Sequence, residues 1–414
     1  MRATTESEPT AVGQPAEVSG RRRATLGLGA LAFGHLAVDC CTGIFPVYKT
    51  LAHLDLHFAG VVATVAGVLS NALQLGFGAL ADRGHSRALL VLGTLGAGAV
   101  VFAPFVEQSG LTFALVLATS IGSAAFHPVA AGATGELSQK RAGLLLALFL
   151  SGGYVGYSLS QLAFTALFRR SVTWALFIVP ALAALALLRF GDIRRHSADA
   201  APPQPLQSAW RSLVPLFAVQ ALAATVNVSL VFLLPDLLLE LHAPAWAAEG
   251  GGHFALVAGG ALALLPAGHA ADRFGARGVL GAALVLAGLC LSLVLGAHLA
   301  PMTLMLTLTA FGAFISASNV VAVSSGNRLA PGRGAGVSAL LMGLPWALAA
   351  LGPLVAGTLA DPRSSGTPSS ALAWVGACLP LAFAAALTVP RLSSHLGPAA
   401  SGGALEAPSV SPRA

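Results

Sequence analysis

The decapeptide GALADRGHSR at residues 78–87 returns later in the chain in a related form, GHAADRFGAR, at residues 268–277. Both copies place an Asp-Arg pair four residues after a glycine, and Asp82 and Asp272 are 190 residues apart. Long apolar runs flank each copy on both sides. The pattern predicts a short charged connection between two apolar helices that is used twice in one chain.

A second motif repeats at the same spacing. Gly122, in GSAAF, and Gly312, in GAFIS, are also 190 residues apart. Between the two halves lies GDIRRHSADAAPPQPLQSAWR, residues 191–211, which interrupts the apolar pattern with charges and three prolines. Because two motifs agree on one offset, we expect an internal duplication of six helices plus six, as in one large class of secondary transporters.

The composition of the 414-residue chain argues against a soluble protein. The chain is 56% hydrophobic and only 9% charged, whereas globular domains carry roughly 25% charged residues. Charge this sparse cannot cover the surface of a soluble protein of this size. The sequence therefore predicts that lipid covers most of the surface, and the 47 glycines suit closely packed membrane helices.

Apolar runs long enough to cross a bilayer, about 20 residues, recur along the chain. They predict an all-α membrane protein with twelve transmembrane helices in two pseudo-symmetric six-helix bundles. The expected helices cover residues 25–47, 57–80, 88–106, 111–132, 143–167, 172–190, 212–234, 253–271, 278–297, 301–323, 335–358 and 371–390.

The distribution of Lys and Arg predicts the orientation in the membrane. Of 22 such residues, the loops of one side hold only Lys49, Arg169, Arg170 and Arg363. This bias predicts that both termini are cytoplasmic in a bacterial inner membrane. The net charge of +6 therefore reports topology and not a surface that binds nucleic acid.

The same reasoning divides the chain into five parts. We expect a cytoplasmic tail over residues 1–24, an N-terminal bundle over 25–190, a cytoplasmic linker over 191–211, a C-terminal bundle over 212–390 and a disordered cytoplasmic tail over 391–414.

The four cysteines all fall within expected helices and lack the spacing of a zinc or redox motif: Cys40, Cys41, Cys290 and Cys378. They predict buried small apolar side chains, with no metal site and no cofactor.

The repeated loops resemble the signature loop of the major facilitator superfamily, G-x-x-x-D-R-x-G-x-[RK]. The second copy is the better match, because His85 replaces the second glycine of the first. The resemblance implies a gate in which the two halves rock and the charged loops re-pair. The gating residues expected from it are Gly78, Asp82, Arg83, Arg87, Gly268, Asp272, Arg273, Gly275 and Arg277. The alternative is a pair of tight turns with solvated charges.

Three further motifs resemble the fosmidomycin-resistance branch of that superfamily, whose best-known members are proton-linked drug exporters. They are Gly34-His35-x3-Asp39-x3-Gly43-x2-Pro46, Phe126-His127-Pro128 and Gly152-Gly153-x2-Gly156. The chain departs from other drug antiporters of the superfamily, with Ala118 in place of an arginine and Ser160-Gln161 in place of Gly-Pro.

Ionisable side chains are rare near the middle of the expected helices, where a charge costs about 2.5–3.5 kcal/mol on an insertion scale. His35 and Asp39 lie four residues apart and so share one helix face. They predict either a structural pair or a proton-coupling site, in which Asp39 holds the proton and the imidazole shares it. The duplication favours the second hypothesis, because Thr225 and Ser229 stand at the equivalent positions.

Other polar groups within the spans are candidates for a substrate cavity: His127, Tyr154, Tyr157, Gln161, Asn227 and Asn319. His127 precedes a proline, so a local structural role remains open for it. Trp346, next to Pro345, is equally open.

The sequence and its resemblance to the superfamily favour one function over two alternatives. We expect a monomeric secondary transporter that works by alternating access and exports a small drug-like molecule or metabolite, with protons as coupling ion. The absence of Arg or Lys in mid-span argues against fosmidomycin itself, which is anionic. A proton symporter for a sugar, organic acid or siderophore is the alternative. An intramembrane enzyme is remote, because the sequence lacks a metal triad, nucleophile elbow or phosphate loop, and no catalytic residue is expected.

Overall fold

The computed structural model describes residues 15–137, 142–190, 210–330, 337 and 339–390. Helices and short connections make up the described part, and no strand occurs within those ranges. The expected C-terminal tail over residues 391–414, residues 1–14 of the expected N-terminal tail over 1–24, and most of the linker lie outside them. The first helix begins at Pro15, ten residues before the expected start of the first span at residue 25.

The described residues of the N-terminal half form seven α-helices. They are α1 (Pro15–Thr42), α2 (Phe45–Leu51), α3 (Leu56–Leu80), α4 (Ser86–Ala97), α5 (Ser109–Glu136), α6 (Ala142–Phe168) and α7 (Ile178–Phe190), with π- or 3-10-helical segments at Ala81–His85, Gly98–Phe105 and Thr173–Phe177.

The C-terminal half is built from more, shorter pieces. They are α8 (Trp210–Glu240), η6 (Ala247–Gly251), α9 (Gly252–Phe274), α10 (Ala276–Gly296), α11 (Pro301–Leu329), η7 (Ala339–Gly343), α13 (Leu344–Ala349), α14 (Gly352–Leu359), η8 (Pro362–Ser364), α15 (Pro368–Gly376) and α16 (Cys378–Leu387).

Eleven segments of the described ranges are long and apolar enough to cross a membrane. One of them, Leu56–Phe105, has 50 residues and would be about 75 Å long as one helix, more than twice the roughly 30 Å of a hydrocarbon core. It contains two spans, because Gly84 interrupts the helical backbone with φ +94°. The predicted twelve-helix fold is confirmed for the described residues.

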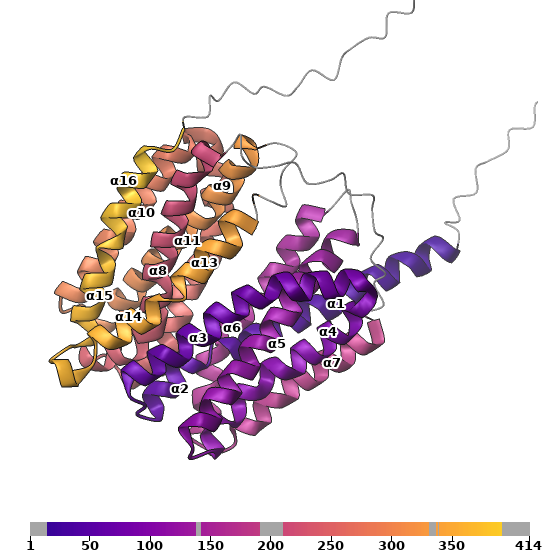
Figure 1. Cartoon of the computed structure of the whole chain (residues 1–414), viewed down its shortest axis with the longest axis horizontal. Helices are drawn as coiled ribbons and strands as arrows, with labels where there is room; N and C mark the ends of the chain where they lie inside the picture. Colours follow the sequence, from indigo (N-terminus) through magenta and orange to yellow (C-terminus); the bar gives the residue numbers. More distant parts are fainter. Residues whose placement is uncertain (1–14, 138–141, 191–209, 331–336, 338, 391–414) are drawn as a thin grey trace, which may run out of the picture.

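Figure 1 shows that the helices form two groups, α1 to α7 and α8 to α16, which meet at one end and diverge at the other. At the meeting end α3 packs against α14, α2 against α8, and α6 against η6. We call this the closed end, and the end that carries residues 81–85 and 274–276 the open end. Both ends of the described chain lie at the open end.

The two repeated loops turn on different glycines. In the second loop Gly275 has φ +83°, a backbone conformation that glycine adopts readily. The equivalent position of the first loop is His85, and there the positive φ is found one residue earlier, at Gly84. A glycine with positive φ therefore occurs in both loops, one residue earlier in the first, although ψ differs: 6° at Gly84 and 142° at Gly275.

One residue expected in a loop is buried. Lys49 was assigned to the connection after a first span ending at residue 47, but α2 continues the chain to Leu51 and the Lys49 side chain is fully buried. Its Nζ forms an ion pair with Asp236 on α8. The partner on the other bundle explains how a charge can lie inside, since an unpaired charge there would be costly.

Candidate functional site

Three ionisable side chains meet where α1, α5 and α6 pack together. His35 Nε2 lies 3.2 Å from Asp39 Oδ2, and His127 Nε2 lies 3.2 Å from Asp39 Oδ1. The two imidazole rings are 5.0 Å apart and edge to face. We call His35, Asp39 and His127 the triad. The i, i+4 pair expected on α1 is thus joined by a histidine from 88 residues away.

The hydrogen bond made by Nδ1 of each imidazole determines which ring nitrogen carries the hydrogen. His35 Nδ1 lies 2.9 Å from the Phe149 carbonyl oxygen, and His127 Nδ1 lies 2.9 Å from the Ser123 carbonyl oxygen. A carbonyl only accepts, so each Nδ1 carries a hydrogen and donates it. Each Nε2 then faces a carboxylate oxygen, and a hydrogen bond forms there only if one of the two atoms holds a further proton. The triad can therefore share up to two exchangeable protons.

The glycines of the helix-six motif let α6 approach α1 closely. A Cβ on Gly153 would lie 2.7 Å from Asp39 Oδ2 and would collide with the His35 ring. A Cβ on Gly156 would collide with the Leu36 carbonyl oxygen. The short motifs at residues 34–46, 126–128 and 152–156 therefore converge on one place, where they build the triad and its packing.

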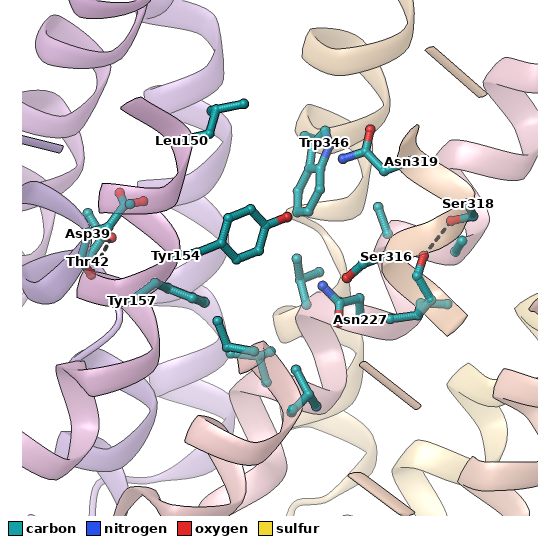
Figure 2. A pocket seen from close by; sticks show the side chains of 18 of the residues that line it. Asp39, Thr42, Leu150, Tyr154, Tyr157, Asn227, Ser316, Ser318, Asn319 and Trp346 are labelled. Atoms are coloured by element: carbon teal, nitrogen blue, oxygen red, sulfur yellow. Dashed lines mark hydrogen bonds between the residues drawn. The ribbon is translucent and has the colours of Figure 1, made fainter. Parts of the chain in front are cut away.

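A cavity of about 330 Å³ lies between the two bundles beside the triad. Figure 2 shows Asp39, Tyr154 and Tyr157 on one side and Asn227, Asn319 and Trp346 on the other. The lining residues come from both halves: His35, Asp39, Thr42, Leu150, Gly153, Tyr154, Tyr157, Gln220, Ala223, Ala224, Asn227, Val228, Val231, Leu256, Val257, Ile315, Ser316, Ser318, Asn319 and Trp346. We call this the main chamber.

Two of the residues expected in a cavity lie elsewhere. His127 stands behind Asp39 and does not belong to the chamber lining found among the described residues. Gln161 is 1% exposed, and its Nε2 donates to the Gly43 carbonyl oxygen at 3.3 Å. Gln161 is one helical turn beyond Tyr157, where α6 already packs against η6 near Gly250. Tyr154, Tyr157, Asn227 and Asn319 do line the chamber.

Sequence reasoning missed two features of this region. Gln220 on α8 also lines the chamber, two turns from Asn227, and its position inside an apolar span was a usable signal. The pairing of Lys49 with Asp236 joins positions 187 residues apart. No local pattern connects them, although each was visible as a charge at the edge of an apolar run.

The closed end is held by charges that link the bundles. Besides Lys49 and Asp236, Arg169 pairs with Glu249 of η6, and Arg363 Nη1 lies 3.0 Å from Asp55 Oδ2. Thr50 Oγ1 adds a hydrogen bond of 2.8 Å to Asp236 Oδ1. In the middle of the interface His253 Nε2 donates to the Tyr157 carbonyl oxygen at 2.8 Å.

The expected gating residues lie at the open end, and Asp272 and Arg87 have partners inside their own bundles. Asp272 pairs with Arg328 on α11, and Arg87 donates to the Leu188 carbonyl oxygen on α7. The Arg273 guanidinium lies 5.3 Å from the centre of the Phe274 ring. Gly78 and Gly268, at the approach to each loop, have open space or only distant contact where a Cβ would stand.

The triad is also the place where a metal ion could be held. Its three candidate ligand atoms lie within 4.8 Å of one another. Two imidazole nitrogens and a carboxylate are ligands that transition metals accept. Shared protons and a bound metal ion are therefore two chemical uses of the same geometry, and a chelator separates them experimentally.

Comparison with solved structures shows the fold. A bacterial homologue of the human lysosomal transporter Spinster, in an inward-facing and unoccupied conformation, is 18% identical with a TM-score of 0.67, over 91% of this chain and 92% of that one. A mutant of the nucleoside transporter NupG is 15% identical with a TM-score of 0.70, over 89% and 100%. The human organic anion transporter MFSD10 (TETRAN) is 17% identical with a TM-score of 0.60, over 90% and 100%.

The search of curated proteins gave no match. The family model of the Major Facilitator Superfamily matches residues 26–259, which is more than half of the chain. The match begins in the first span and ends in α9, so it covers one whole bundle and part of the other. The chain therefore belongs to the Major Facilitator Superfamily, and it is a multi-pass membrane transporter and not an enzyme.

Proposed function

We propose that this protein is a secondary active transporter that exports a small organic molecule in exchange for protons, across a bacterial inner membrane with both termini cytoplasmic. The observation that carries the proposal is the triad in the wall of a chamber between two bundles. Asp39 and His35 line that chamber, and His127 contacts Asp39 from behind. A proton held there is within reach of whatever occupies the chamber.

The shape of the two groups of helices supports alternating access. The chamber is lined by both bundles, so a rocking motion about it would expose it first at one end and then at the other. In the present state the closed end is joined by three ion pairs. The charge bias of the loops supports placing the open end on the cytoplasmic side, ready to take up substrate for export.

The triad supports proton coupling because its hydrogen bonds depend on protons. With two shared protons, both Nε2–Asp39 contacts are hydrogen bonds. With only one, the other contact places a lone pair of a histidine Nε2 opposite a lone pair of an Asp39 oxygen at 3.2 Å. Loss of a proton therefore favours a local rearrangement of Asp39, which stands at the chamber wall. The motifs that resemble the fosmidomycin-resistance branch supply all three side chains, and this supports export as the direction.

The experiment uses everted membrane vesicles that are energised to be acidic inside. Acridine orange reports the pH difference while fosmidomycin or an alkyltrimethylammonium salt is added. We expect an exported compound to dissipate the pH difference in wild-type vesicles and not in Asp39→Asn vesicles. The amide keeps the shape of the carboxylate but cannot carry the proton. Downhill exchange of the same compound should survive in that variant. His35→Gln should show partial loss.

Glu107→Gln is the matched control, because Glu107 is an exposed carboxylate in the connection before α5. It should behave as wild type. Full proton-coupled export by Asp39→Asn would remove the coupling role from Asp39. Loss of activity on adding a chelator would show that the triad holds a metal ion instead. Accumulation of substrate in right-side-out vesicles with an inward proton gradient would show import.

A further inference from the structure

A second chamber lies next to the main one. It has a volume of about 190 Å³ and is lined from both bundles, among others by Phe45, Ala63, Ala66 and Val116 of the N-terminal half and Phe232 of the C-terminal half. Four residues line both chambers: Thr42, Tyr157, Val228 and Val231. These four form a shared wall, so a molecule in the main chamber stands beside the second one.

The lining of the second chamber is mostly apolar, with hydroxyl groups only at Thr42, Thr119, Ser120 and Tyr157 among the described residues. Phe45, Phe232 and Val116 give it aromatic and aliphatic walls, and none of the described residues that line it is charged. Two of its hydroxyls already have backbone partners. Thr42 Oγ1 donates to the Asp39 carbonyl oxygen at 3.2 Å, and Thr119 Oγ1 accepts from the Val100 N–H at 2.9 Å. The second chamber therefore suits a hydrocarbon group and offers little to a polar one.

The main chamber carries the opposite chemistry. Asp39 contributes a carboxylate, and no lysine or arginine occurs among its described lining residues. On the facing wall Gln220 Oε1 and Asn227 Oδ1 are buried acceptors without a hydrogen-bond partner in the described part of the chain. Acceptors on both walls suit a ligand group that brings hydrogen-bond donors or positive charge.

Aromatic rings add to this preference. In Figure 2 the Tyr154 side chain points across the chamber toward Trp346. Faces of tyrosine and tryptophan attract cations, including quaternary ammonium groups. A cation in the main chamber would have a carboxylate and two aromatic side chains among its lining residues, whereas an anion would meet no fixed positive group except a protonated histidine.

We propose that the two chambers together bind an amphipathic organic cation, with its ammonium group in the main chamber near Asp39 and its hydrocarbon tail in the second chamber. This inference names the substrate class for the transport function proposed above and rests on it for its biological meaning. The binding itself does not depend on proton coupling, so the two can be tested apart.

The test measures binding to the full-length protein in lipid nanodiscs by calorimetry. The probes are ethyl-, butyl-, hexyl- and octyltrimethylammonium, with alkyl sulfates and alcohols of the same chain lengths as anionic and uncharged counterparts. We expect each methylene that enters the second chamber to raise affinity about fourfold. The cation should bind at least about tenfold more tightly than the sulfate of equal length.

Variants locate each part of the ligand. Ala63→Phe and the milder Ala66→Leu partly fill the second chamber, so the gain with chain length should shrink while the short cations bind as in wild type. Ala72→Phe is the matched control, because Ala72 is an exposed position on the same helix, α3. Asp39→Asn should weaken all cations and leave the alcohols unchanged.

Binding of the short cations also shows that the filled variants are folded. Equal affinity for cation and sulfate, an undiminished chain-length gain in both filled variants, or no binding of any alkylammonium to the wild type would each overturn the inference. Proton-coupled transport of another compound could then still be intact. Conversely, tight alkylammonium binding without dissipation of the pH difference would reject the proposed coupling and keep this binding site.

Discussion

The two ends of the molecule hold their charges in different ways. At the closed end the ion pairs join one bundle to the other, as Lys49 does with Asp236. At the open end Asp272 pairs with Arg328 inside the C-terminal bundle. The closed-end lysine is fully buried, whereas Asp272 and Arg328 side chains are 57% and 48% exposed. If the two bundles rock as proposed, the motion would break the ion pairs between bundles and could leave the pair within the C-terminal bundle in place.

Burial sets the cost of each of these changes. A buried pair loses much when one partner is removed, because the remaining charge is left without water or a counter-charge. An exposed pair is worth about 0–1 kcal/mol, because water and salt replace the partner. We therefore expect the closed end to control stability and the open end to control the balance between states. Substitutions at the two ends test that division.

The largest effect is expected at Lys49 and Asp236. Lys49→Met or Asp236→Asn alone should lower the free energy of unfolding by about 3–5 kcal/mol, because a buried charge or acceptor loses its partner. The buried cysteines allow this to be measured as thermal unfolding with a thiol-reactive dye. The double variant Lys49→Met/Asp236→Leu removes both charges and should recover most of the stability.

The same double variant sharpens the comparison. Without the pair, the closed end should open more often, although the protein is stable. Spin labels at His53→Cys and Ser364→Cys, exposed positions on opposite bundles at the closed end, should report a broader and longer distance distribution than in the wild-type background. Single variants as stable as wild type, or an unchanged distance distribution in the double variant, would show that the Lys49–Asp236 pair does not hold the closed end together.

The balance between states should respond to the open end. Asp272→Asn removes the exposed pair with Arg328 and should cost little stability, about 0–1 kcal/mol, yet it should slow transport severalfold. A shift of the equilibrium between the two access states changes turnover without touching the substrate. Asp82→Asn in the first loop should slow transport as well. Turnover at the wild-type rate in both variants and in their combination would leave the loops as turns without a gating role.

Most of the fold was accessible from sequence, because a bilayer demands apolar helices of a set length and the duplication identified the two halves. The His35 and Asp39 pair was accessible for the same kind of reason, since helical spacing alone places them on one face. The contact of Asp39 with His127, and that of Lys49 with Asp236, depend on packing between distant segments. Periodicity carries no information about such contacts.

The positive-φ turn of the first loop illustrates a further limit. Comparison of the two repeats identified His85 as a departure from the motif, because the position equivalent to Gly275 in the first repeat is not a glycine. The chain instead turns at Gly84. A shift of one residue is invisible to a fixed offset, yet it costs the backbone nothing, because glycine adopts positive φ at either position.

The smallest effect is expected at Arg169 and Glu249, which link the bundles at the closed end but near the surface. Arg169 is 61% exposed and Glu249 is 21% exposed. Arg169→Ala should therefore lower the free energy of unfolding by less than about 1 kcal/mol, even though it joins the same two bundles as the Lys49 pair. The dye-based unfolding measurement compares the two directly, with Arg170→Ala as the exposed neighbour control. A loss as large as that of Lys49→Met would mean that bridging the bundles, and not burial, determines what a closed-end pair contributes.

Both pairs must separate when the closed end opens, so the comparison also tells which pair sets the free-energy barrier to opening. If burial dominates, it is the Lys49 pair, because its charges must be rehydrated as the bundles separate.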